Sequence, residues 1–138
     1  KAKRDIDRAS RPYYNSVEGD ILYDLGKLKQ SMKAYKAALK DQPLLAGSLL
    51  GIGRCMMDIN KTKTAITYME RAVRIRPRLT EAHYLLGKAY EKTDRQKSLR
   101  YYHYFAKQAS ADPEFLAVIK DVKKRIGRLQ RKTKQSAN

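Results

Sequence analysis

The chain has 138 residues, and 31 lysines and arginines against 14 aspartates and glutamates give it a formal net charge of +17. A hydrophobic fraction of 42% is sufficient for a packed core and argues against a disordered chain. The single cysteine, Cys55, excludes an internal disulfide and a cysteine-based metal site. No apolar run approaches the roughly 20 residues of a membrane-spanning helix. The charge favours an acidic partner: nucleic acid, anionic lipid or an acidic protein surface.

A basic N-terminal segment is expected over residues 1–11, which hold five basic and two acidic residues. Pro12 interrupts any helix that begins in this segment. Because the sequence opens with Lys1 rather than with methionine, we expect it to be an excised part of a longer chain.

The rest of the chain repeats with a period of 34 residues. Large apolar residues share one position of this period at Leu22, Met56 and Tyr90. Small residues and prolines share three others: Gly19, Gly53 and Gly87; Ala38, Ala72 and Ala106; Pro43 and Pro77. A fixed period of this length is typical of solenoids built from stacked helix pairs.

The first repeat is expected at about 12–45, with a first helix that ends near Gly26 and a second helix at about 29–40. Asn15 and Glu18 stand where later repeats have larger apolar residues or a histidine. They weaken the apolar face of the first helix and predict a terminal, partly exposed unit. We expect this helix to bury Tyr14, Val17, Ile21, Leu22 and Leu25.

The second repeat (46–79) is expected to hold helices near 46–59 and 62–76, and the third (80–112) near 80–92 and 95–109. In the last of these helices, strict spacing places His103 where the earlier repeats have Tyr35 and Met69. We favour a register shifted by one residue, which places Tyr102 there instead. The shift puts four apolar residues on one face at helical spacing, namely Leu99, Tyr102, Phe105 and Ala106.

A capping helix is expected at about 113–131. Asp112, Pro113 and Glu114 form a helix start: a side-chain acceptor, a proline in the first turn and an acidic residue. Apolar residues follow at steps of four and three, a stripe suited to cover the last repeat: Phe115, Ile119, Val122, Ile126 and Leu129. Residues 132–138 are expected to be a polar, disordered tail.

The repeat units resemble the tetratricopeptide repeat. The middle unit carries Gly53–Arg54–Cys55–Met56, then Ala65–Ile66–Thr67–Tyr68–Met69, then Ala72 and Pro77. The third supplies Leu86–Gly87–Lys88–Ala89–Tyr90, and the resemblance extends over about 12–113. It implies an all-α, right-handed solenoid of three helix pairs plus a C-terminal capping helix. It does not specify a function, because this scaffold serves many partners.

The resemblance also implies a concave groove lined by the first helix of each pair, where an extended peptide or protein segment binds. The chain would then be a non-catalytic interaction scaffold. The alternative is that these helix faces are merely solvated and the partner docks elsewhere. The implied groove positions are Tyr13, Ser16, Asp20, Tyr23, Asp24, Gly47, Leu50, Arg54, Met57, Asp58, Glu81, Tyr84, Lys88, Glu91 and Lys92.

The sequence directly tests membership of one subfamily, whose members bind chaperone tails. Members that bind chaperones grip a C-terminal Glu-Glu-Val-Asp with lysine, asparagine and arginine at five groove positions. None of these matches here, and two are acidic where the ligand's carboxylates would lie. The sequence therefore does not predict a receptor for chaperone tails. The five positions read Ser16, Asp20, Gly51, Glu81 and Leu85.

No catalytic, metal or cofactor site is expected. His83 and His103 lack further ligands at metal-binding spacing, and His83 falls in an apolar repeat position, as a packed histidine would. Cys55 lies beside Met56 in a predicted helix and is expected to be unreactive. The glycines at 47, 51 and 53 share that helix, so they indicate close helix packing rather than a phosphate loop.

Two alternative functions remain. A nucleic-acid-binding repeat would use lysines and arginines for phosphates and Tyr101, Tyr102 or Tyr104, near Arg100, for stacking. The basic charge, however, gathers on the second helix of the middle repeat and on the capping helix rather than in the groove, so a solvated basic face is the simpler interpretation. Residues 12–40 also resemble repeat modules that follow bacterial envelope zinc metalloproteases. That resemblance implies a domain that guides substrates or partners in the envelope; without it a cytoplasmic location is expected.

Overall fold

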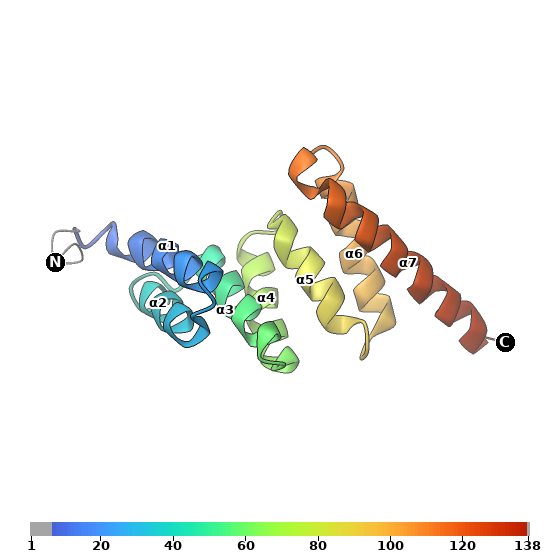
Figure 1. Ribbon diagram of the computed structural model, residues 1–138, viewed down its shortest axis with the longest axis horizontal. Coiled ribbons are helices and arrows are strands. Elements are labelled where there is room, and N and C mark those ends of the chain that lie inside the picture. The colour runs from blue at the N-terminus through green and yellow to red at the C-terminus, as the bar shows by residue number, and fades with distance from the viewer. Residues whose placement is uncertain (1–6, 138) are drawn as a thin grey trace. The chain divides into compact units, whose positions relative to one another are not determined.

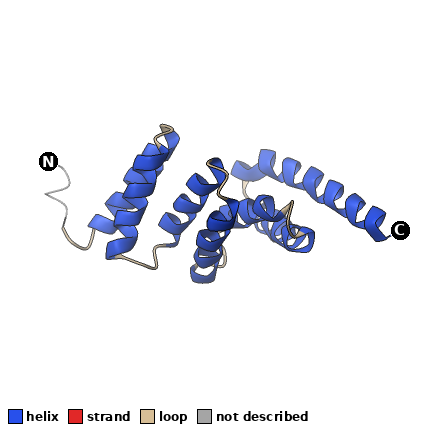
Figure 2. Ribbon diagram, turned by 90° about the horizontal axis from the view of Figure 1, so that it is seen from below, coloured by secondary structure: helices blue, strands red, loops and turns tan. Residues whose placement is uncertain are grey.

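The computed structural model describes residues 7–137, and throughout this range the regular structure is helical, without strands (Figures 1 and 2). The all-α class and the organisation in helix pairs are thereby confirmed. The chain divides into two compact units, the first ending at Pro77 and the second beginning at Arg78. The helices are α1 (Arg11–Asp24), α2 (Leu28–Asp41), α3 (Ala46–Asp58), α4 (Thr62–Ile75), α5 (Thr80–Tyr90), α6 (Arg95–Ala109) and α7 (Leu116–Ala137), with a short 3-10 turn, η2 (Pro113–Phe115), before α7.

The repeated glycines let the two helices of each pair approach closely. A side chain at Gly19 would collide with the ring of Tyr35, and one at Gly53 would collide with Met69. In the third pair, Gly87 faces Tyr102 in the same way. Each of these glycines accommodates a large, fully buried residue of the second helix, which accounts for their regular spacing along the chain.

The shifted register of the third repeat is confirmed, since Tyr102 is fully buried and His103 is exposed. The turns between paired helices explain the shift. The first two turns place a residue in the left-handed conformation, Gly26 with φ of 74° and Asn60 with φ of 60°. The third turn instead begins α6 with Asp94, whose side chain accepts a hydrogen bond from the Lys97 amide at 3.0 Å.

The prediction for the buried face of α1 is wrong. Val17 and Ile21 are each 56% exposed and Leu25 is 63% exposed, whereas Asn15 and Gly19 are buried. Tyr14 is also exposed, and only Leu22 of the predicted set is partly buried.

The repeat register gives the physical reason for this exposure. Residues of α3 at the positions equivalent to Tyr14 and Ile21 are Ser48 and Cys55, which contact the preceding helix pair through Ser16 and Ser31. No described helix precedes α1 to cover its apolar residues at these positions. The predicted partly exposed character of the first repeat is confirmed.

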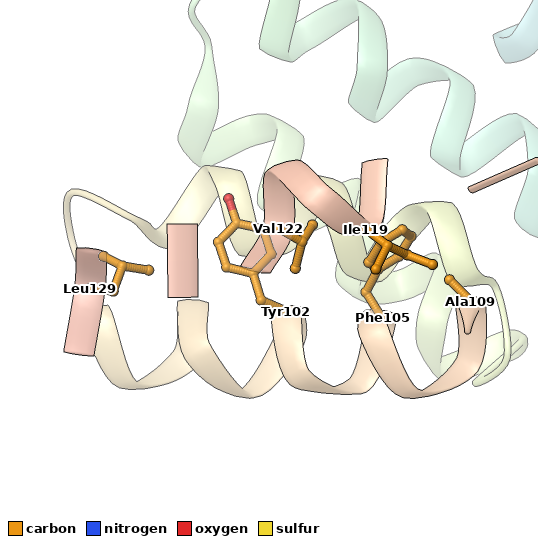
Figure 3. Close-up of a cluster of buried hydrophobic side chains, with 6 residues drawn as sticks. All are labelled: Tyr102, Phe105, Ala109, Ile119, Val122 and Leu129. Atoms are coloured by element: carbon orange, nitrogen blue, oxygen red, sulfur yellow. The ribbon is translucent and has the colours of Figure 1, made fainter. Parts of the chain in front are cut away.

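In the second unit, α7 packs on α6 as the capping helix. Ile119, Val122 and Leu129 are buried against Tyr102 and Phe105 (Figure 3). The remaining members of the predicted stripe, Phe115 and Ile126, are partly buried against the same cluster, so the predicted stripe is confirmed. Asp112 caps η2 by accepting a hydrogen bond from the Glu114 amide at 3.0 Å.

The two ends of the chain differ from expectation or lie partly outside the described range. Helix α7 continues to Ala137, so residues 132–137 are not a disordered tail. Lysine, arginine and glutamine favour helix, and no glycine or proline follows Leu129 to end it. Residues 1–6 of the predicted basic segment lie outside the described residues.

Candidate functional site

The first unit brings its predicted groove positions together on α1 and α3. Leu50 is the exception because its side chain is only 5% exposed. Burial of a leucine is favourable by about 1.5–3 kcal/mol, so Leu50 belongs to the core and cannot contact a partner without rearrangement. The predicted positions with accessible or partly accessible side chains are Tyr13, Ser16, Asp20, Tyr23, Asp24, Arg54, Met57 and Asp58.

A hydrogen-bonded network fixes the polar side chains of this unit. Tyr35 of α2 donates its hydroxyl to Asp20 Oδ1 at 2.6 Å. Arg54, which holds the position of Asp20 in the next repeat, donates Nη2 to the same oxygen at 3.2 Å. Successive repeats thus place opposite charges in contact, and the guanidinium has a defined position at the surface.

A second pair extends the network. Tyr23 donates its hydroxyl to Asp58 Oδ2 at 2.8 Å, and the guanidinium of Arg54 lies 4.5 Å from the centre of the Tyr23 ring. Burial and the carboxylate of Asp58 raise the pKa of Tyr23 to about 12. The phenol therefore remains a protonated donor at neutral pH.

In the second unit, Glu91 joins the capping helix to the third repeat. Tyr102 donates its hydroxyl to Glu91 Oε1 at 2.5 Å, Arg125 Nη1 donates to the same oxygen at 2.7 Å, and Arg128 Nη2 donates to Oε2 at 3.1 Å. Burial works to raise the pKa of Glu91, but these hydrogen bonds outweigh it and hold the pKa below its usual value. Glu91, predicted to contact a partner, is instead engaged within the unit.

The other predicted positions of the second unit lie on the accessible side of α5 or directly after that helix. Tyr84 is half-buried, with its ring 5.5 Å from that of Phe105. Lys88 Nζ lies 5.5 Å from the centre of the Tyr84 ring, and Lys92 is exposed. Glu81 and Tyr84 line a pocket of about 370 Å³ beside η2 and α7, whose other lining residues are Phe105, Glu114, Phe115 and Val118.

A basic, aromatic pocket of about 240 Å³ lies on α5 and α6. His83 is buried, as predicted for a packed histidine, with its ring centre 4.0 Å from that of Tyr104. Tyr101 stacks on Tyr90 at 5.9 Å. Lys97 and Arg100 complete the lining. Of the three tyrosines considered for stacking on bases, Tyr102 is core and only Tyr101 and Tyr104 are accessible in part.

The side chains with possible reactivity are packed. Cys55 is fully buried with its Sγ 3.7 Å from Ser31 Oγ, and burial raises the pKa of its thiol. Within residues 7–137, no group of three or more histidines, cysteines or acidic residues could hold a metal ion. None of the described helices combines the length and the apolar content needed to cross a membrane.

Sequence reasoning missed the contribution of the capping helix to this surface. Phe115 and Val118 follow Glu81 and Tyr84 by 34 residues each, so η2 and α7 present the same two repeat positions as α5. The period itself was the available signal. The apolar stripe at 115, 119, 122, 126 and 129 by itself places Phe115 in the core and gives no sign of this second role.

The sequence comparison matches residues 13–42 and 46–79 to the family described as tetratricopeptide repeat. The match covers the two repeats of the first unit.

Solved structures share the fold over nearly the whole chain. The type III secretion translocator chaperone SycD of Yersinia enterocolitica superposes with a TM-score of 0.83 at 14% identity, over 95% of this chain and 90% of the chaperone. The same chaperone in complex with a peptide of the translocator YopD gives a TM-score of 0.79 at 14% identity, over 88% of this chain and 93% of that chain. The TPR2B domain of yeast Sti1, in a complex with pHsp70, gives a TM-score of 0.76 at 12% identity, over 88% of this chain and 98% of that domain's chain.

Proposed function

We propose that this chain, whose residues 13–42 and 46–79 match the tetratricopeptide-repeat family, is a non-catalytic scaffold that binds a peptide or an extended protein segment along the first helices of its pairs. Two of the structures that share its fold are complexes, one with a translocator peptide and one with pHsp70. Likeness at 14% identity or less supports the kind of function and leaves the partner open.

The observation that carries the proposal is the fixed arrangement of tyrosine and arginine at the predicted groove positions. Arg54 is held by Asp20 and by the ring of Tyr23, and Tyr84 is held against Phe105. Tyrosine and arginine supply much of the binding energy at protein interfaces. Side chains that are already ordered lose less conformational entropy when a partner binds.

Selection from a phage-displayed library of random peptides tests the proposal. We expect the wild-type protein to enrich a set of related peptides. The double variant Arg54→Ala with Tyr84→Ala should weaken their binding by about tenfold or more, because it removes two ordered contacts. A helical circular dichroism spectrum like that of the wild type would show that the variant is folded.

The matched control is Arg71→Ala with Arg74→Ala, two exposed arginines of α4 that lie outside the predicted groove. This control should bind the selected peptides as the wild type does. Failure to enrich any peptide, or equal loss of binding in both double variants, would refute the proposed function.

Binding of nucleic acid is a second candidate, favoured by the pocket that combines Lys97 and Arg100 with Tyr101 and Tyr104. Cations would meet phosphates and the rings would stack on bases. Anisotropy of labelled single-stranded RNA and DNA checks this candidate. If the candidate is correct, the affinity for nucleic acid falls steeply with added salt. The double variant Lys97→Ala with Arg100→Ala should lose this binding. Absence of binding at low salt would eliminate it.

A further inference from the structure

The pocket between α5 and the start of α7 is built from equivalent positions of two successive helices. Glu81 and Phe115 are 34 residues apart, as are Tyr84 and Val118, and all four line the pocket. The capping helix therefore takes the place of the first helix of a further repeat at this point. A surface that repeats position by position is suited to an extended segment crossing both helices.

Aromatic and aliphatic side chains form most of this pocket. The ring of Phe105 meets that of Phe115 edge to face at 5.7 Å and that of Tyr84 at 5.5 Å. Phe105 is fully buried in the α6–α7 core (Figure 3), which fixes this wall in place. The volume of about 370 Å³ falls within the range of roughly 300–1,000 Å³ typical of ligand pockets. Such a preformed apolar pocket suits a large hydrophobic side chain.

The charged residues that line this pocket are acidic, and Lys88 Nζ lies 5.5 Å from the centre of the Tyr84 ring. Glu81 and Glu114 are among the six lining residues, and none of the six is lysine or arginine. The whole chain, by contrast, has a net charge of +17. Two carboxylates beside an apolar pocket attract a cation and repel phosphates and acidic peptides.

We propose that this pocket binds a peptide segment in which a leucine or another large apolar residue lies two residues from a lysine or arginine. The apolar side chain enters between Tyr84, Phe115 and Val118, and the cation lies against Glu81 and Glu114. In an extended peptide, side chains two residues apart point the same way, about 6.6–6.8 Å apart, so one segment can supply both. This inference rests on the proposed peptide-binding function and names its partner class.

Four synthetic peptides that differ only at two positions test the chemistry by fluorescence anisotropy. One carries leucine and lysine, one leucine and glutamate, one serine and lysine, and one serine and glutamate. We expect the leucine–lysine peptide to bind about tenfold more tightly than either peptide with a single change. Equal affinity for the leucine–lysine and leucine–glutamate peptides would overturn the proposed role of the carboxylates.

Charge reversal provides the sharper test. Glu81→Lys with Glu114→Lys should reverse the preference, so that the leucine–glutamate peptide binds more tightly than the leucine–lysine peptide. The control, Asp41→Lys with Glu70→Lys, changes the net charge equally but lies in the first unit, and it should keep the wild-type preference. A reversed preference in both variants would mean that long-range charge alone decides, which would overturn the assignment to this pocket.

A pocket-filling variant tests the apolar contact separately. Val118→Phe should abolish the advantage of leucine over serine while leaving the advantage of lysine over glutamate. If the peptide library yields binders but none of these changes alters the preference, this inference fails and the proposed function stands. If the library yields no binder and the four peptides also fail to bind, both fail.

Discussion

The two units fill their equivalent groove positions in different ways. In the first unit, Tyr23 and Arg54 are engaged with Asp58 and Asp20, and Leu50 is buried. In the second unit, the comparable polar contacts converge on Glu91, and the pocket beside Tyr84 is left accessible. The difference arises from the helix that follows each pair. A second repeat follows in the first unit, and a capping helix with its own arginines follows in the second.

The largest effect is expected at the glycines that adjoin Tyr35. This ring lies between Gly19 and Gly51, so it cannot move away from a side chain added on either. Gly51→Ala should lower the free energy of unfolding by about 3 kcal/mol through overpacking. Chemical denaturation followed by circular dichroism measures this change.

Gly47→Ala is the matched control on the same helix, because an added methyl there meets nothing within 4 Å. It should leave stability unchanged or raise it by up to about 1 kcal/mol. A similar loss of stability in Gly47→Ala and Gly51→Ala would mean that Tyr35 does not require the space beside Gly51.

Alanine variants of two valines compare the stability contributed by the exposed apolar face of α1 with that contributed by the interface of the capping helix α7. Val122 is fully buried on α7, whereas Val17 is 56% exposed on α1. Val122→Ala should cost about 2 kcal/mol, since the substitution loses buried area and leaves a cavity. Val17→Ala should remain within about 0.5 kcal/mol of the wild type. A large loss for Val17→Ala in the same denaturation experiment would indicate that this face is covered in solution.

The hydroxyl groups of Tyr35 and Tyr102 hold equivalent positions but have different acceptors. The side chain of Glu91, which accepts from Tyr102, is 17% exposed, whereas that of Asp20, which accepts from Tyr35, is 54% exposed. Tyr102→Phe should therefore cost about 1.5 kcal/mol and Tyr35→Phe about 0.5 kcal/mol, because solvent replaces the lost bond more easily at Asp20. Thermal unfolding of the two variants measures the difference, and the reverse order would contradict this account.

The smallest effect is a dependence of stability on acid. Glu91 has a pKa below its unfolded value, so its contribution is present above the unfolded pKa and is lost as the pH falls through the folded pKa. Solvent screening keeps this contribution below about 1 kcal/mol. Denaturation midpoints measured between neutral pH and about pH 3 should therefore fall less steeply in Glu91→Gln than in the wild type. Parallel curves for the two proteins would exclude a role for this carboxylate.

Most of the fold could be predicted from spacing. The interval of 34 residues located Gly19, Gly53 and Gly87, each of which faces a large residue of the second helix, and helical periodicity selected Tyr102 over His103. Burial on α1 could not be predicted in the same way. Its apolar residues at 14, 17, 21 and 25 form a regular stripe, and a stripe alone does not tell whether another helix covers it.

The candidate site was predictable only in part. The register identified Arg54 and Tyr84, but it also included Leu50 and Glu91, which the packing turns inward or engages internally. Whether a side chain at a groove position is exposed to solvent depends on the helix packed beside it. Because that helix is distant in the sequence, local spacing does not predict the exposure.

By itself the sequence determined the repeat period, the helix pairs and the capping helix, because these follow from local preferences and regular spacing. Only the tertiary structure decided that α1 exposes its apolar stripe, that Glu91 joins the cap to the third repeat, and that Phe115 and Val118 complete a pocket with Tyr84. These outcomes depend on contacts between helices that are far apart in the sequence. A side chain gains free energy from burial only where another helix covers it, and local sequence does not determine that.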